Sequence, residues 1–140
     1  MSLYRSRIAG TGSYLPSKIL SNFDLEKMVD TNDQWIRERT GIERRHIAAP
    51  ELATSDLAYE ASKSAIADAN LKTEDIDFII FATCTGDFRL PATACVLQTK
   101  LGMTTVPAID INAACSGFLY GLSMADAYIR MGTYKNVLVV

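Results

Sequence analysis

The stretch Pro107-Ala108-Ile109-Asp110-Ile111-Asn112-Ala113-Ala114-Cys115-Ser116-Gly117-Phe118 decides the fold of this chain. An apolar, β-branched run ends in two small residues, and Cys115 then opens a long apolar segment, so the pattern predicts a buried strand followed by a helix. At such a turn Cys115 would face free backbone N–H groups and the positive end of the helix dipole. That setting favours the thiolate, and we interpret Cys115 as a nucleophile. A small, inert core cysteine is the alternative.

The segments around this stretch predict alternating helices and strands. Leu57, Ala61, Ala65 and Ala69 recur every four residues, which predicts a helix with a narrow stripe that packs closely on a sheet. The expected elements are a helix from Ser55 to about Asn70 capped by Thr54, a strand over Ile76–Thr83, a helix from Pro91 to near Gly102, a strand over Val106–Ile111, a helix from Cys115 to Gly132, and a strand over Asn136–Val140. This order predicts a parallel α/β sheet. Cys115 would then lie at the carboxyl end of a strand, where such sheets place their ligands.

The part of the chain before Ala53 gives weaker signals. Arg7–Pro16 reads as a short strand that runs into a glycine-rich turn. A dinucleotide fingerprint is disfavoured because its third glycine is missing, and a tight turn that uses the positive φ of glycine explains the pattern. Ser21 predicts a helix cap with Asp24 three positions later, and Thr31 predicts a second capping box with Gln34.

Trp35 and Arg39 lie four residues apart on the second of these predicted helices, so they share a face. An aromatic ring beside a guanidinium can stack on a purine and meet a phosphate. The alternative is a tryptophan that packs on the core next to an unrelated arginine.

Composition excludes several classes of function. The 140 residues carry a net charge of -2, so a general nucleic-acid role is disfavoured and Arg44-Arg45 is only a local basic pair. We expect no membrane span and a cytoplasmic location. Three cysteines and one histidine match neither a disulfide framework nor a metal site. The helix after Cys115 is apolar nearly all round and should be buried. A last strand of Val-Leu-Val-Val needs a neighbour, so we expect the chain to be the amino-terminal part of a larger fold or to need a partner chain.

Three ordered motifs together resemble the β-ketoacyl-[acyl-carrier-protein] synthase III family. They are Gly10-Thr11-Gly12-Ser13-Tyr14-Leu15-Pro16, Asp33-Gln34-Trp35-Ile36 with Arg39-Thr40-Gly41-Ile42, and Ala113-Ala114-Cys115-Ser116-Gly117-Phe118. The resemblance implies a thiolase-like fold, with α-β-α-β-α layers in a full-length homodimer. Residues 1–140 would be most of the amino-terminal half, with the second half absent.

The resemblance also implies a reaction. Cys115 would take the acyl group of an acyl-CoA, typically acetyl-CoA, and the acyl-cysteine would condense with malonyl-acyl carrier protein with loss of carbon dioxide. This step initiates type II fatty-acid synthesis. The partners would be acyl-CoA, acyl carrier protein and a second copy of the protein. No permanently bound cofactor or metal is expected, because coenzyme A enters as a thioester substrate.

Family positions assign further residues. Thr31, Trp35 and Arg39 fall where relatives contact the nucleotide end of coenzyme A. Leu90 falls where many relatives carry a phenylalanine that reaches the partner subunit's acyl pocket. The strand over Val106–Ile111 falls where family dimers join their sheets.

The family also needs a histidine and an asparagine from its second half, and His46 does not match that histidine's motif. We therefore expect the chain alone to be acylated at best, with negligible condensation. The alternatives are a thiolase-fold ketosynthase of secondary metabolism, and a non-catalytic fragment that only binds a carrier protein or a partner half.

Overall fold

The computed structural model describes residues 5–140 and divides them into two compact units. One unit comprises residues 5–14 and 53–140, and the other comprises residues 15–52. The larger unit carries the predicted parallel sheet, and the smaller unit carries a two-stranded antiparallel sheet. Each unit is described separately below.

The larger unit is built on three parallel strands, which lie in the order β4-β3-β5. These are β3 (Phe78–Ala82), β4 (Ala108–Ile111) and β5 (Val137–Val139). The helices between them are α3 (Thr54–Asp68), α4 (Thr93–Lys100) and α5 (Gly117–Arg130), with short 3-10 turns at η1 (Thr73–Asp75) and η2 (Ala114–Ser116). The predicted alternation of strands and helices, and the parallel sheet, are confirmed.

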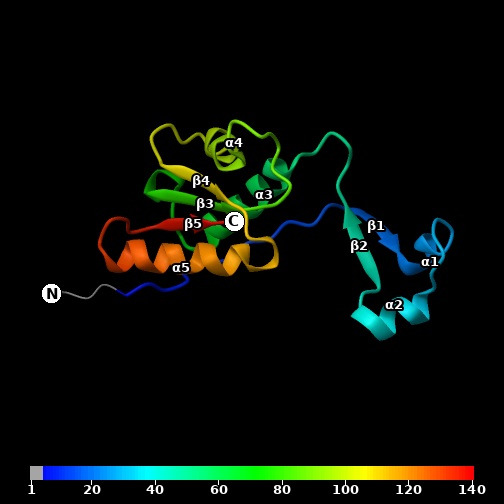
Figure 1. Ribbon diagram of the computed structural model, residues 1–140. Helices are drawn as coiled ribbons and strands as arrows, with labels where there is room; N and C mark the ends of the chain where they lie inside the picture. The colour runs from blue at the N-terminus through cyan, green and yellow to red at the C-terminus, as the bar shows by residue number, and fades with distance from the viewer. Residues whose placement is uncertain (1–4) are drawn as a thin grey trace. The chain divides into compact units, whose positions relative to one another are not determined.

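Helices cover both faces of this sheet. In Figure 1, α5 runs along one face of the strands, and α3 and α4 lie on the other. The central strand β3 is buried along nearly its whole length, with Ile79 and Ile80 completely enclosed. Burial on both faces explains why its sequence is continuously apolar rather than alternating.

Residues 5–14 form no strand, contrary to the prediction for Arg7–Pro16. The segment packs against the small-residue stripe of α3. A Cβ built on Gly10 would lie 2.4 Å from the backbone nitrogen of Ala69, and one on Gly12 would lie 2.3 Å from the carbonyl oxygen of Ala61. Neither glycine has a positive φ, so the expected positive-φ turn is wrong. Glycine is required here because the two backbones approach each other closely.

The smaller unit pairs β1 (Lys18–Ser21) with β2 (Arg44–Ile47) in antiparallel register and adds α1 (Asn22–Leu25) and α2 (Asp33–Thr40). Ser21 and Asp24 form the predicted capping box of α1. Gly41 ends α2 at a φ of 70°, a conformation that glycine adopts without strain. The sequence pattern missed the strand pair, because each strand has only four residues.

Two predicted helix caps are wrong. Asn32, not Thr31, caps α2 by accepting the Trp35 N–H, and Gln34 bonds to Glu38 instead of reaching back. The Thr54 hydroxyl donates to the carbonyl oxygen of Thr85, a contact that lies 31 residues away in sequence. The spacing of residues near Thr54 cannot reveal that a distant carbonyl group competes with the helix end for its hydroxyl group.

Candidate active site

Cys115 lies where the sequence predicts it, between β4 and α5 at the carboxyl edge of the sheet. The thiol is exposed. It is not the first residue of the helix, because it occupies the 3-10 turn η2 and α5 begins two residues later at Gly117. Ala114 precedes it with a φ of 46°, which is uncommon for a residue with a side chain. Such local strain is typical of turns that hold a reactive side chain in place.

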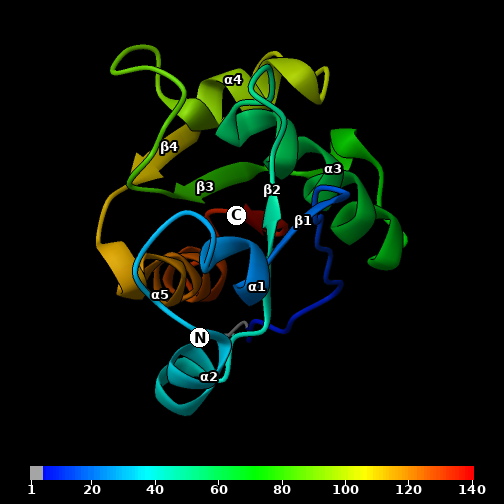
Figure 2. The same ribbon diagram turned by 90° about the vertical axis from the view of Figure 1, so that its right-hand side faces the viewer.

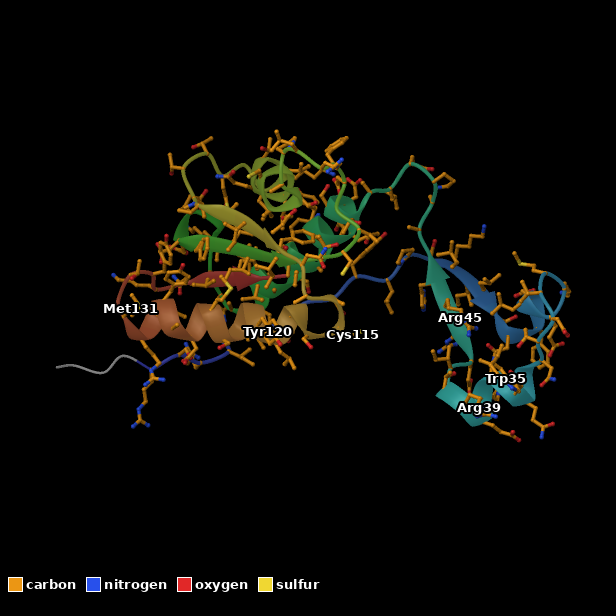
Figure 3. All side chains as sticks on the ribbon, in the orientation of Figure 1. Trp35, Arg39, Arg45, Cys115, Tyr120 and Met131 are labelled. Carbon is orange, nitrogen blue, oxygen red and sulfur yellow. The ribbon has the colours of Figure 1, made fainter. Side chains whose placement is uncertain are left out.

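Gly121 lets α5 lie close to the sheet and so positions the turn that carries Cys115. A Cβ at Gly121 would lie 2.9 Å from Cγ1 of Val139 and 3.4 Å from Cγ2 of Ile80. Only a residue without a side chain fits between the helix and these two strands. Figure 3 shows Cys115 at the amino end of α5, with Tyr120 further along the same helix.

The outer face of α5 is exposed, contrary to the prediction that this helix is buried all round. Only Gly117, Gly121 and Ala125 of α5 are buried, whereas Leu119 is 65% exposed and Tyr120 58% exposed. Leu119 and Tyr120 are therefore largely accessible to solvent within the larger unit, residues 5–14 and 53–140. The large apolar side chains of α5, such as Leu119 and Tyr120, are therefore not part of the core of the larger unit.

Two other groups lie at the same edge of the sheet as Cys115. Cys84, two residues after β3, donates its thiol proton to Oδ1 of Asn112 at 3.1 Å, and Asn112 directly follows β4. Cys84 is exposed, whereas Cys95 is half-buried on α4. The Cys84–Asn112 contact was missed at the sequence level. It could have been found, because the carboxyl ends of neighbouring parallel strands meet at one edge.

Trp35 and Arg39 lie together on α2, as their spacing predicts. The guanidinium carbon of Arg39 lies 5.9 Å from the centroid of the Trp35 ring, within the range of a cation–π contact (Figure 3). Trp35 is 54% exposed, so the alternative in which it packs on the core is wrong. Within residues 5–140 no carboxylate pairs with Arg39. An exposed aromatic ring and an unpaired cation remain available to a ligand. Thr31 lies just before α2 and is half-buried.

A buried amide holds α2 against the rest of the smaller unit. Asn22 is completely enclosed; its Nδ2 donates to Oδ1 of Asp33 and to the Ile42 carbonyl oxygen, both at 2.8 Å. Its Oδ1 accepts from the Arg45 guanidinium. The bond from Asn22, together with the Arg37 guanidinium, holds the pKa of Asp33 below its usual value. This connection was not anticipated, because its members lie far apart in the sequence.

The remaining predicted residue, Leu90, is 87% exposed in the loop before α4. The structure therefore places Cys115 and Leu90 in the larger unit, and Thr31, Trp35 and Arg39 in the smaller one. Among residues 5–140, no three His, Cys, Asp or Glu side chains gather as metal ligands would. No helix in that range has the length and apolar character needed to cross a membrane.

Comparison with known proteins gives consistent matches. The family model for 3-oxoacyl-[acyl-carrier-protein (ACP)] synthase III matches residues 109–140, which include Cys115. The chain is 61% identical over 133 residues to the β-ketoacyl-[acyl-carrier-protein] synthase III of Caldanaerobacter subterraneus subsp. tengcongensis. That match covers 95% of this chain and 40% of the relative.

Solved structures agree with this match. The 3-oxoacyl-[acyl-carrier-protein] synthase III of Aquifex aeolicus VF5 superimposes with a TM-score of 0.91 and 53% identity, over 95% of this chain and 43% of that one. The priming β-ketosynthase of the R1128 polyketide pathway superimposes with a TM-score of 0.92 and 31% identity, over 99% of this chain and 42% of that one.

The chain thus spans about two-fifths of the length of the proteins it matches. The expected thiolase-like α/β fold is confirmed by these structures. Over 95% of its length, the chain is therefore similar in sequence and in fold to the amino-terminal part of proteins of the β-ketoacyl-[acyl-carrier-protein] synthase III family.

Proposed function

We propose that residues 1–140 are the amino-terminal thiolase-like half of a condensing enzyme and supply its acyl-accepting cysteine, Cys115. The observation that carries the proposal is the exposed thiol of Cys115 on a strained turn at the carboxyl edge of a parallel sheet. The match of 61% identity to a synthase III over 95% of the chain supports the same role.

The first step is an acyl transfer to sulfur. The Cys115 thiolate attacks the carbonyl carbon of an acyl-CoA thioester, most simply acetyl-CoA, and a new carbon–sulfur bond forms. The bond from that carbon to the sulfur of coenzyme A breaks, and coenzyme A leaves as its thiolate, which takes up a proton. Backbone N–H groups at the turn between β4 and α5, that of Cys115 among them, can stabilise the negative charge on the carbonyl oxygen.

Trp35, Arg39 and Thr31 would bind the nucleotide end of coenzyme A. The exposed ring of Trp35 offers a surface for the adenine, and the unpaired guanidinium of Arg39 offers a partner for a phosphate. Leu90, at 87% exposure, is available to reach a partner subunit's acyl pocket, and β4 is the strand at which two copies would join their sheets.

In the complete enzyme the acyl-cysteine would then react with malonyl-acyl carrier protein. Loss of carbon dioxide leaves a carbanion that attacks the acyl carbonyl carbon, and the Cys115 sulfur departs as a thiolate. The product is a 3-ketoacyl-carrier protein, the first condensation product of type II fatty-acid synthesis in the cytoplasm.

The test is transfer of an acetyl group to the intact chain. After incubation with acetyl-CoA at neutral pH, peptide mass spectrometry should find the added acetyl group on Cys115 and not on Cys84 or Cys95. Cys84→Ala is the matched control and should acetylate normally, whereas Cys115→Ala should not acetylate. Acetylation spread equally over the three cysteines, or found on none, would contradict the proposal.

A ketosynthase of polyketide synthesis is the second candidate, favoured by the TM-score of 0.92 with the R1128 priming enzyme. The identity of 31% to that enzyme is half of the 61% to the synthase III, so we rank it second. The two candidates differ in the acyl donor that they prefer. If Cys115 accepts an acetyl group more slowly than it accepts longer acyl groups from their coenzyme A thioesters, the polyketide ketosynthase is favoured.

A further inference from the structure

The loop between β3 and α4, residues 83–92, is bonded to the rest of the larger unit at its base and exposed at its tip. Figure 2 shows it as the green loop that runs from β3 to the start of α4 and projects beyond them. Its tip comprises Phe88, Arg89 and Leu90, all of which are exposed. At its base, the Thr54 hydroxyl donates to the Thr85 carbonyl oxygen at 2.6 Å. The exposed tip is therefore carried by a loop whose base is fixed to α3.

Asp87 supplies a second connection between this loop and α3. Its Oδ1 accepts from the Ser55 N–H at 2.9 Å, and its Oδ2 accepts from the Ser55 hydroxyl. Ser55 is completely buried in the first turn of α3, where backbone N–H groups lack partners within the helix. The helix dipole favours a carboxylate at this end, and hydrogen bonds to a charged acceptor are stronger than neutral ones. Asp87 therefore ties the loop to α3 through its side chain.

The backbone of Asp87 ties the loop to its own far end. The Asp87 N–H donates at 3.1 Å to Oγ1 of Thr93, the first residue of α4, and Thr93 is completely buried. The N–H groups of Thr93 and Ala94 donate in turn to the carboxylate of Asp110 on β4, both at 2.7 Å. Residues 88–92 therefore form a short bridge between two fixed points.

We propose that Asp87 is a positioning residue that sets the acyl-chain preference through Leu90. This inference rests on the proposed function, in which Leu90 reaches a partner subunit's acyl pocket. With both ends of the bridge fixed, the Leu90 side chain stays in one place and resists an acyl chain that is too long. A residue that walls a pocket discriminates between chain lengths only when supporting contacts fix it, because a loose side chain yields to extra methylene groups. The feature of the coenzyme A thioester that Asp87 selects is thus the length of its acyl chain.

Asp87 rather than Asp110 controls the loop. Asp110 bonds to the first two N–H groups of α4, so the loss of its carboxylate would disturb that helix itself. Both hydrogen bonds of the Asp87 side chain go to Ser55 instead. Removing the Asp87 carboxylate should therefore release the loop while the start of α4 keeps its partner.

The first measurement is trypsin cleavage of the intact chain after Arg89, at the tip of the loop. Asp87→Ala should raise the cleavage rate by about tenfold or more. Cleavage follows the population of the open loop, and a hydrogen bond to a charged group shifts that population by such a factor. Asp87→Asn should restore slow cleavage, since its side-chain oxygen still accepts from the Ser55 N–H and its amide group can donate to the Ser55 hydroxyl.

Asp77→Ala is the matched control in the same unit. Like Asp87, Asp77 is half-buried, and its side chain also accepts two hydrogen bonds, from the N–H groups of Lys135 and Asn136. Lys135 is exposed and offers trypsin a second site. Asp77→Ala should speed cleavage after Lys135 and leave cleavage after Arg89 unchanged, whereas Asp87→Ala should do the reverse.

The second measurement is competition between acetyl-CoA and hexanoyl-CoA for Cys115, with the ratio of the two acyl groups read by peptide mass spectrometry. Asp87→Ala should raise the hexanoyl share by about threefold or more, and Asp87→Asn and Asp77→Ala should leave it unchanged. Leu90→Ala should raise the hexanoyl share as well. The variant that carries both Asp87→Ala and Leu90→Ala should show no further rise, because Asp87 acts through a side chain that is already gone.

Faster cleavage after Arg89 with an unchanged acyl ratio would overturn the proposal, because Asp87 would then only stabilise the loop. Unchanged cleavage in Asp87→Ala would overturn it too, and so would effects of Asp87→Ala and Leu90→Ala that add in the double variant. A wild-type chain that takes up neither acyl group would contradict the proposed role of Cys115 itself, and the assignment of acyl-chain preference to Asp87 would fall with it.

Discussion

Cys115 differs from the other two cysteines in its surroundings rather than in its chemistry. It occupies a strained turn at the start of a helix, whereas Cys84 donates to Asn112 and Cys95 is half-buried in α4. The thiolate is the form of a cysteine that reacts with electrophiles, so the surroundings of each thiol decide how fast it reacts.

We therefore expect iodoacetamide at neutral pH to label Cys115 faster than Cys84, although both thiols are exposed. The two exposed thiols differ in their surroundings, because Cys84 donates its proton to Oδ1 of Asn112 whereas Cys115 lies on the turn before α5. Time-resolved peptide mass spectrometry measures all three rates in one sample, with Cys84 as the exposed control. Equal rates for Cys84 and Cys115 would favour a non-catalytic fragment.

Trp35 is the single tryptophan of the chain, so its fluorescence reports directly on the proposed nucleotide site. Coenzyme A should quench it by stacking. Arg39→Ala should weaken the binding by about fivefold, because a cation at an exposed site contributes about 1 kcal/mol. Arg44→Ala, an exposed arginine of the same unit, is the matched control and should bind normally. If Arg39→Ala and Arg44→Ala bind alike, Arg39 does not contact the ligand.

At the scale of the elements, α5 owes its position to small residues on one face. Gly117, Gly121 and Ala125 are its buried residues, and they recur every four positions. Large apolar side chains elsewhere on α5 are exposed, among them Leu119 and Tyr120, and Figure 3 labels Tyr120 on this helix. Within residues 5–14 and 53–140, the fully buried residues of α5 therefore all lie on one side of the helix.

Gly121→Val should move α5 away from β5, because the new Cβ would lie 2.9 Å from Val139. Overpacking of this kind costs about 1–3 kcal/mol of unfolding free energy. Ala127→Val places the same side chain on the exposed side of α5 and should cost only about 0.5 kcal/mol of helix propensity. Urea denaturation measures the unfolding free energy of both variants. If Gly121→Val and Ala127→Val lose the same amount, the close contact at Gly121 does not limit stability.

At the scale of the whole molecule, the chain covers about two-fifths of its relatives, and β4 and β5 are the edge strands of the three-stranded sheet in the described residues. The resemblance to the synthase III family implies that decarboxylation uses a histidine and an asparagine of the second half, which we do not expect within these 140 residues. We propose that Cys115 accepts the acyl group and that the second reaction needs those two groups.

We therefore expect the chain alone to form acetyl-Cys115 with negligible condensation. Each missing oxyanion donor costs about 10²- to 10³-fold in rate. Incubation with radiolabelled acetyl-CoA and malonyl-acyl carrier protein should give labelled protein and almost no 3-ketoacyl product. Robust product from the isolated chain would contradict this expectation.

The sequence by itself determined the parallel sheet, the order of its helices, and the place of Cys115 after β4. These features follow from local patterns: runs of apolar residues as in Phe78–Ala82, and small residues at the turn. The Trp35–Arg39 pair was predictable for the same reason, since a spacing of four residues places two side chains together on any helix.

Only the tertiary structure decided which neighbours these elements meet. It showed that Gly10 and Gly12 serve a close contact with α3, that Thr54 bonds to Thr85 instead of capping, and that Asn22 joins Asp33 to Arg45. It also showed that residues 5–14 form no strand although their pattern favours one. A strand exists only when another strand pairs with it, and the presence of that partner is a property of the assembled fold that no local pattern contains.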